Sequence, residues 1–260
     1  MRDLTYRPVV SFAKTCFKIL GIRFQMRGTD NIPRTGAAVI AFNHISYVDF
    51  IFGGFAADPS RRFVRFMAKK EIFDNRFAGP LMRSLHHISV DRSDGMPSFE
   101  QALDYLQQGE LVGLFPEATI SYTYELKEFK SGTVRLAAKA GVPIIPVIVW
   151  GTQRMFPKGR KPDFRRGQTL AITVGEPLYV DGGDALLETA ELKARMRALL
   201  DETIRAYPEM PEGAWWLPRS YGGSAPDTKE AEQMHRDERR KMLAMLRKQK
   251  EEREQRGQQP

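Results

Sequence analysis

Short apolar runs of strand length recur along the chain, and segments with helical spacing lie between them. The runs cover residues 37–42, 63–68, 87–90, 111–115, 144–150 and 170–174. One intervening segment places Phe99, Leu103 and Leu106 on a single helical face and ends at Gly109. Strands that alternate with helices form mostly parallel sheets covered on both faces. The pattern therefore predicts an α/β fold with a mostly parallel twisted sheet and helices on both faces.

The beginning of the chain departs from this alternation. Residues 8–20 predict an amphipathic helix, in which Phe12 and Phe17 are apolar and Lys14 and Lys18 are basic. Two uses of such a helix stay open. It can cover the core, or it can lie on an anionic membrane surface.

The chain is expected to have three parts. Residues 1–22 form the amphipathic membrane-surface helix, and residues 23–220 form the domain that carries the chemistry. Residues 221–260 form a linker followed by a charged helical tail, because Lys, Arg, Asp and Glu dominate the chain after Lys229.

Charge and cysteine content narrow the compartment and the partners. The formal net charge of +8 favours anionic partners, which include nucleic acid, acyl-carrier phosphates and the anionic cytoplasmic leaflet. The single cysteine, Cys16, excludes an internal disulfide framework and suits a reducing compartment. No apolar window reaches the roughly 18 residues of a spanning helix. We therefore expect a cytoplasmic protein that is peripheral on the cytoplasmic face of the cell membrane.

Residues with chemically useful side chains follow four of the apolar runs. In an open α/β sheet, ligands bind beyond the carboxyl ends of the strands, so these positions are expected to lie at one edge. They are His44 and Asp49 after the first run, Lys69, Lys70 and Glu71 after the second, Asp91 and Arg92 after the third, and Glu117 after the fourth.

The spacing of His44 and Asp49 allows the carboxylate to fold back onto the imidazole. Asp49 would then hold one ring N–H, and the other ring nitrogen would take a proton from an acceptor hydroxyl. An acyl thioester would be attacked directly, without a covalent enzyme intermediate. The structural alternative is that Asp49 caps its helix and His44 packs in a turn.

Four ordered blocks surround these residues. They are Asn43-His44-x-Ser46-x-x-Asp49, Val90-Asp91-Arg92, Phe115-Pro116-Glu117-Ala118-Thr119 and Val142-Pro143-Ile144-Ile145-Pro146-Val147, with Ala68-Lys69-x-Glu71 and Phe129-Lys130-x-Gly132 between them. Over about residues 30–180, this set resembles the 1-acylglycerol-3-phosphate acyltransferase family, the PlsC-type glycerophospholipid acyltransferases.

The resemblance implies an acyltransferase of phospholipid biosynthesis. Its donor would be acyl-CoA or acyl-carrier protein, and its acceptor would be a lysophospholipid, 1-acylglycerol-3-phosphate above all. It implies no metal and no other cofactor, and it makes His44 and Asp49 the catalytic pair. It also implies that Glu117 shapes the acceptor site and that Lys69 and Arg92 lie near the acceptor phosphate. Salt bridges at strand ends are the alternative for the last two residues.

The third block departs from the family pattern Phe-Pro-Glu-Gly-Thr-Arg-Ser. Ala118 replaces the glycine, and Ile120 replaces the arginine, whose planar fork suits phosphate. Other cations must therefore hold an acceptor phosphate, or the acceptor is not a glycerol phosphate. Lys69, Lys70, Arg92 and Lys130 are the candidate substitutes, and Thr119 with the backbone N–H groups of its loop could bind an oxyanion.

Three other functions stay open beside this reading. The enzyme could acylate a different acceptor, such as a glycolipid hydroxyl, or the chain could be a catalytically silent lipid-binding protein. Nucleic-acid binding ranks last, because no aromatic and basic groove accompanies the net charge, and we expect no nucleic-acid partner. The expected partners are membrane lipids with their anionic surface, together with acyl-CoA or acyl-carrier protein.

Overall fold

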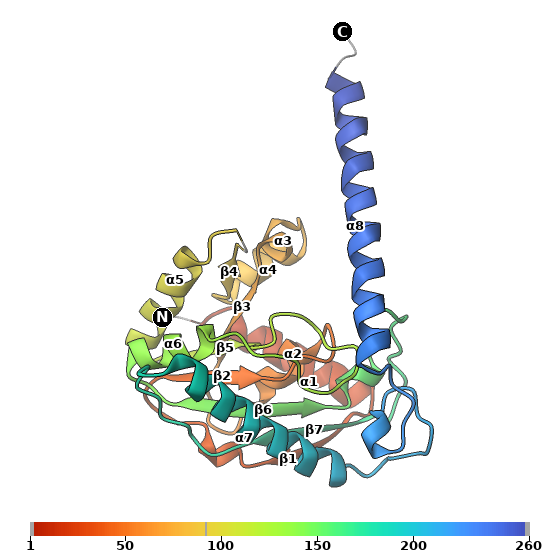
Figure 1. Cartoon of the computed structure of the whole chain (residues 1–260). Helices are drawn as coiled ribbons and strands as arrows, with labels where there is room; N and C mark the ends of the chain where they lie inside the picture. The colour runs from red at the N-terminus through yellow and green to blue at the C-terminus, as the bar shows by residue number, and fades with distance from the viewer. Residues whose placement is uncertain (1–2, 92, 258–260) are drawn as a thin grey trace. The chain divides into compact units, whose positions relative to one another are not determined.

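The computed structural model describes residues 3–91 and 93–257, and within them it shows a seven-stranded sheet with helices on both faces (Figure 1). The strands are β1 (Arg23–Arg27), β2 (Ala38–Phe42), β3 (Val64–Lys69), β4 (Ile88–Val90), β5 (Leu111–Leu114), β6 (Ile144–Trp150) and β7 (Thr169–Val174). The helices are α1 (Tyr6–Ile19), α2 (Asp49–Gly54), α3 (Lys70–Asp74), α4 (Ala78–Ser84), α5 (Met96–Gln107), α6 (Gly132–Ala140), α7 (Ala185–Arg205) and α8 (Thr228–Gly257).

The sheet has the order β1-β7-β6-β2-β5-β3-β4, and every neighbouring pair is parallel except β6 and β7. Helices α5, α6 and α7 pack on one face, and α1 and α2 pack on the other. All residues of β2 and β6 are buried, as expected for strands covered on both faces. The predicted mostly parallel α/β fold is confirmed.

Helix α1 packs against the domain through one face. The ring of Phe17 lies in the main hydrophobic core, with its centroid 4.7 Å from that of Phe52. The hydroxyl of Tyr6 donates to the carbonyl oxygen of Val64 on β3 (2.8 Å). Phe12 and Ile19 point outward and are 71% and 62% exposed. The helix therefore covers the core, and its use on a membrane surface stays a prediction.

A buried cation fixes the start of α1. Arg65 on β3 is fully buried, and its guanidinium pairs with the carboxylates of Asp3 (2.8 Å) and Glu110 (3.3 Å). The same guanidinium lies 5.4 Å from the ring centroid of Tyr6. Because a buried charge is costly without a partner, these contacts hold the first residues of the described chain against the sheet.

The chain forms two compact units. The first comprises the described residues through Ser121 together with Leu126–Glu209, and it holds the whole sheet. The second comprises Tyr122–Glu125 and the chain from Met210 onward, in which Trp216 is buried. In the part of the chain that the structure describes, no helix combines the length and apolar character that a bilayer crossing needs.

Candidate active site

The loop after β2 is fastened to the neighbouring strand β6 by one side chain. Asn43 is fully buried, and its amide donates to the carbonyl oxygen of Val149 (3.0 Å) and accepts from the Val149 N–H (2.7 Å). These two bonds continue the pairing of β2 with β6 beyond Phe42. His44 therefore leaves the sheet from a fixed backbone position at the carboxyl ends of the strands.

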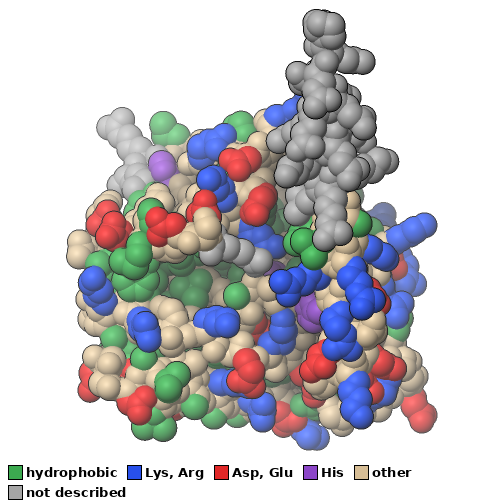
Figure 2. Space-filling view, turned by 45° about the horizontal axis from the view of Figure 1, so that its top comes forward, with side chains coloured by type: hydrophobic (Ala, Val, Ile, Leu, Met, Phe, Trp, Pro, Cys, Tyr) green, Lys and Arg blue, Asp and Glu red, His purple; other side chains and the backbone are tan. Residues whose placement is uncertain are grey.

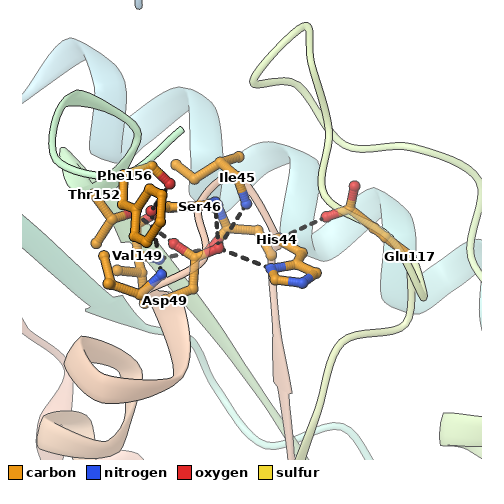
Figure 3. Close-up of polar contacts among 10 residues, drawn as sticks. His44, Ile45, Ser46, Asp49, Glu117, Val149, Thr152 and Phe156 are labelled. Atoms are coloured by element: carbon orange, nitrogen blue, oxygen red, sulfur yellow. Dashed lines mark hydrogen bonds and ion pairs between the residues drawn. The ribbon is translucent and has the colours of Figure 1, made fainter. Parts of the chain in front are cut away.

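The carboxylate of Asp49 collects four hydrogen bonds around this loop (Figure 3). Oδ2 accepts from Nδ1 of His44 (2.9 Å) and from the backbone N–H groups of Ile45 (2.7 Å) and Ser46 (2.7 Å). Oδ1 accepts from the hydroxyl of Thr152 (2.5 Å). Asp49 is fully buried at the first residue of α2, so it shapes the loop as well as orienting the imidazole.

These contacts determine which nitrogen of His44 carries the proton in the neutral ring. Because Oδ2 of Asp49 accepts from two backbone N–H groups, it also acts as the acceptor toward Nδ1, which therefore holds a hydrogen. Nε2 points away from Asp49 with its lone pair available (Figure 3). The ring stacks on Phe115, with 4.1 Å between centroids, and its side chain is 20% exposed. In this geometry, Nε2 of His44 is able to accept a proton.

The segment after β6 supports the same loop from the other side. The carbonyl oxygen of Phe156 accepts from the hydroxyl of Ser46 (2.8 Å) and from the Tyr47 N–H (3.0 Å). Thr152 from this segment binds Asp49, and it belongs to none of the sequence blocks. The rule applied to the other strands would have found it, because Thr152 follows the apolar run of β6.

Glu117 joins the loop after β5 to His44. Its side chain is 4% exposed, and Oε1 accepts from the His44 N–H (2.9 Å), while Oε2 accepts from the Lys127 N–H (3.0 Å). Burial raises the pKa of Glu117 to about 7, against the opposing effect of these two hydrogen bonds. Both oxygens bind backbone groups, so Glu117 fixes the loop beside His44.

The rest of the third block forms a tight turn next to Glu117. Ala118, at the position of the family glycine, has a φ of 58°, in the left-handed region that glycine adopts more easily. The hydroxyl of Thr119 accepts from Nζ of Lys127. Ile120 is buried and 5% exposed. Lys127 is a part of this turn that no sequence block marks.

The other predicted binding residues lie in different settings. Lys69 is exposed at the end of β3, and Lys130 is exposed with its backbone N–H donating to Pro116 (2.9 Å). Lys70 pairs with Asp91 at 3.1 Å. Arg92 lies outside the described residues. The structure thus brings His44, Asp49, Glu117 and Thr119 together in one pair of adjoining loops.

An apolar pocket lies between α1, α2 and β3. Its lining residues are Tyr6, Val9, Val10, Ala13, Phe50, Ile51, Gly54, Phe55, Asp58, Arg62, Phe63, Phe66, Leu85 and His87. The ring of Phe66 stacks on that of Phe115 with 6.2 Å between centroids, and Phe115 stacks on His44, so aromatic rings connect the pocket wall to His44. Most of this lining is aliphatic or aromatic, and Asp58, Arg62 and His87 are its ionisable residues besides Tyr6.

Of the adjacent histidines His86 and His87, the second is hydrogen-bonded within the fold. His87 is buried, its Nδ1 accepts from the Phe66 N–H (3.1 Å), and burial lowers the pKa of its imidazole to about 4. Across residues 3–91 and 93–257, no group of three or more His, Cys, Asp or Glu side chains is placed to hold a metal ion.

Comparison with known proteins gives consistent matches. A family model described as "Acyltransferase" matches residues 23–150. The chain is 31% identical over 199 residues to the 1-acyl-sn-glycerol-3-phosphate acyltransferase of Bacillus subtilis, covering 74% of this chain and 94% of that protein. It is 26% identical to the protein of the same name from Pseudomonas aeruginosa, covering 72% and 70%.

A solved structure shares the fold. The crystal structure of the 1-acyl-sn-glycerophosphate (LPA) acyltransferase, PlsC, from Thermotoga maritima superposes with a TM-score of 0.62 at 25% identity, covering 78% of this chain and 80% of that one. The matched family segment runs from β1 through β6, and it therefore includes both loops that meet at His44.

Proposed function

Because the chain belongs to the 1-acylglycerol-3-phosphate acyltransferase family, we propose that it acylates the free hydroxyl of a lysophospholipid in phospholipid biosynthesis. It is an acyltransferase of the 1-acyl-sn-glycerol-3-phosphate acyltransferase type. The proposed acceptor is 1-acylglycerol-3-phosphate, and the donor is acyl-CoA or acyl-carrier protein. The observation that carries this proposal is the contact between His44 and Asp49, which leaves Nε2 of a fixed imidazole available as a base.

The proposed reaction uses this imidazole twice. Nε2 of His44 removes the proton of the acceptor hydroxyl while the hydroxyl oxygen attacks the thioester carbonyl. The imidazolium is stabilised by the carboxylate of Asp49, which already accepts the Nδ1–H. As the carbon–sulfur bond breaks, Nε2 returns the proton to the leaving thiolate, so an ester and a free thiol are the products. No covalent bond to the enzyme is needed.

The apolar pocket supports an acyl donor. Its walls carry the aliphatic and aromatic side chains of α1 and α2, and the stacked rings of Phe66 and Phe115 extend from it to His44. In the proposed complex, the acyl chain lies in this pocket and the thioester carbon lies at Nε2. Burial of apolar chain surface would stabilise the complex by about 0.8 kcal/mol for each methylene group.

A thiol-release assay tests the proposal. Purified protein is mixed with long-chain acyl-CoA or acyl-carrier protein and with lysophosphatidate, a glycolipid or no acceptor. We expect thiol release that depends on lysophosphatidate and a matching diacyl product. In the His44→Ala variant, this rate should fall by about 10²-fold to 10⁴-fold, because the general base is absent. The fold of the variant should be unchanged.

The other outcomes identify the remaining functions. Thiol release that depends only on the glycolipid would show that the acceptor is a glycolipid and not a phospholipid. Ile120 in the third block favours this alternative. Equal release without any acceptor would indicate a thioester hydrolase and contradict the proposal. If the protein binds lipid but releases no thiol from either donor, it is a catalytically silent lipid-binding protein.

Peripheral association with an anionic membrane surface is part of the proposal. Two exposed aromatic residues support it, Phe12 on α1 (71% exposed) and Phe77 before α4 (74% exposed), where the guanidinium of Arg76 lies 4.4 Å from the Phe77 ring centroid. Figure 2 shows exposed hydrophobic side chains among Lys and Arg side chains on the face that it views. Such a mixture suits the interface of an anionic bilayer.

Point variants test this association without removing core residues. Phe12→Ser and Phe77→Ser should weaken binding to liposomes that contain anionic lipid, while Leu186→Ser, at an exposed site on α7, should not. Activity on acceptor dispersed in detergent should stay unchanged in all three. Equal liposome binding by all three variants and the wild type would contradict the proposed surface.

A further inference from the structure

The loop after β5 contains a half-buried cation, the ammonium group of Lys127, that belongs to none of the sequence blocks. We propose that Lys127 binds the phosphate group of the acceptor, in place of the arginine that the family pattern has at the position of Ile120. This inference rests on the proposed function, because it assigns a ligand within the acceptor site of the same reaction.

The position of Lys127 relative to the base follows from three hydrogen bonds. The loop joins the backbone of His44 at two points, through Oε1 of Glu117 (2.9 Å from the His44 nitrogen) and through the Ser121 N–H (2.7 Å from the His44 carbonyl oxygen). Thr119 lies between these two residues, and its hydroxyl accepts from Nζ of Lys127. The ammonium group therefore contacts the same turn that binds the backbone of His44.

This placement suits the geometry of a glycerol phosphate acceptor. In 1-acylglycerol-3-phosphate, the free hydroxyl and the phosphate ester are on adjacent carbon atoms. A hydroxyl that meets Nε2 of His44 brings its phosphate close to the base, so the ligand for the phosphate has to lie in a neighbouring turn. The turn that contains Thr119 is such a neighbouring turn, because Glu117 and Ser121 on either side of it bind the backbone of His44.

The ammonium group of Lys127 is prepared for an anion. It has three N–H donors, and Thr119 accepts from one of them. Burial lowers the pKa of Lys127, Glu117 raises it, and Lys158 lowers it, so a second cation lies within electrostatic range. Within the described chain, no ion pair joins Nζ of Lys127 to a carboxylate. An acceptor phosphate would supply the missing negative charge.

The lysines proposed from the sequence differ from Lys127, because they either pair with a carboxylate or are more exposed to solvent. Lys70 already pairs with Asp91 at 3.1 Å, and Lys130 is exposed. The side chain of Ile120 is buried and offers no hydrogen-bond donor. The loss of the family arginine is thus compensated in three dimensions by a lysine that the chain brings back to the same turn.

The kinetic test compares Lys127→Gln and Lys127→Arg with Lys139→Gln, a control at an exposed lysine on α6. Lys127→Gln should raise the acceptor KM for lysophosphatidate about tenfold or more, as expected for a lost charge-assisted hydrogen bond. The KM for an uncharged monoacylglycerol and the melting temperature should stay the same. Lys127→Arg should recover most of the lysophosphatidate affinity, and Lys139→Gln should match the wild type.

The donor also carries phosphate groups when it is acyl-CoA, so the donor KM is measured in the same series. A rise in the donor KM with an unchanged acceptor KM would assign Lys127 to the donor and overturn the inference. An equal rise for lysophosphatidate and for monoacylglycerol would show a general distortion of the loop and would also overturn it.

A binding measurement separates this inference from the proposed function. Glycerol 3-phosphate is titrated into wild type and into Lys127→Gln, and the shift in melting temperature gives the affinity without turnover. A shift in wild type that is lost in Lys127→Gln supports the phosphate site whether or not acyl transfer is observed. Identical behaviour of the two proteins overturns the site, even if wild type is an active acyltransferase.

Discussion

Substitutions of Asp49 should separate its structural task from its electrostatic task. In the structure, one oxygen accepts from His44, Ile45 and Ser46, and the other accepts from the hydroxyl of Thr152. In Asp49→Asn, the amide oxygen can take the three bonds of Oδ2. The amide NH₂ can then donate to the Thr152 hydroxyl, which is able to accept as well as donate. We therefore expect Asp49→Asn to keep the loop and the Nδ1–H tautomer of His44.

The expected loss in Asp49→Asn comes from the missing negative charge next to the imidazolium. A hydrogen bond to a charged group is worth about 1.5–3 kcal/mol more than no bond, and part of a neutral bond remains. At about 1.36 kcal/mol for each factor of ten, the upper bound on the fall in kcat is about 150-fold. The free energy of unfolding should fall only modestly, because the three donors to Oδ2 keep an acceptor while the O–H of Thr152 loses one.

Asp49→Ala should behave differently. It leaves four donors without an acceptor at a fully buried position, and each unsatisfied group costs about 1–3 kcal/mol. The sum is a large share of the roughly 5–15 kcal/mol that stabilise a domain. We expect a marked loss of stability as well as of turnover.

Two assays decide between these outcomes. Thiol release at saturating substrates gives kcat, and urea denaturation gives the free energy of unfolding, with Asp201→Asn on α7 as a surface control. Equal destabilisation by Asn and Ala at position 49 would refute the hydrogen-bond reasoning. A fall in the kcat of Asp49→Asn far beyond about 150-fold would show that the tautomer is not held by the backbone N–H groups.

Three further predictions concern stability and chain length. Burial raises the pKa of Glu117 from 4.5 to about 7, so the free energy of unfolding falls by about 3 kcal/mol as the pH rises from 4.5 to about 7. Burial lowers the pKa of His87 from 6.5 to about 4, so the free energy of unfolding falls by a similar amount as the pH drops from 6.5 to about 4. The free energy of unfolding is measured by denaturation at several pH values between about 4 and about 7. Relative to wild type, its slope against pH should be more positive in Glu117→Gln and more negative in His87→Gln. Slopes equal to that of wild type would contradict the two pKa assignments. Ala118→Gly should raise the free energy of unfolding by up to about 1 kcal/mol, because it relieves a positive φ, and a decrease would argue against strain there. Val10→Trp should fill the apolar pocket and shift the donor preference to shorter acyl chains; a chain-length profile like that of wild type would exclude the pocket as the acyl site.

The sequence predicts best those parts of the fold in which burial restricts a position to apolar residues. Strands β2 and β6 are buried on both faces, so their runs are almost wholly apolar and easy to detect. Strand β1 was missed, because its sequence Arg23–Arg27 begins and ends with exposed arginines at the edge of the sheet. Helices α3 and α4 were also missed, since they are short and α4 contains Gly79 and Pro80.

The candidate site divides in the same way between local and distant contacts. His44 and Asp49 are five residues apart, so their spacing allows the contact that the structure shows. Thr152 and Lys127 reach the site only through the packing of β6 and the return of the long loop after β5. No spacing rule within one segment contains that information.

The packing of α1 changes where this domain should be considered to begin. Similarity to the family model starts at residue 23, yet the pocket wall, a core aromatic ring and a counter-ion of Arg65 all come from before that point. A protein truncated at the first matched residue would expose the core around Phe52 and leave Arg65 with one fewer carboxylate in a buried place. Its inactivity would reflect unfolding, and it would reveal nothing about membrane binding by the removed helix. The limit of the match to the family model is therefore not the limit of the folding unit, which also includes Asp3 and helix α1.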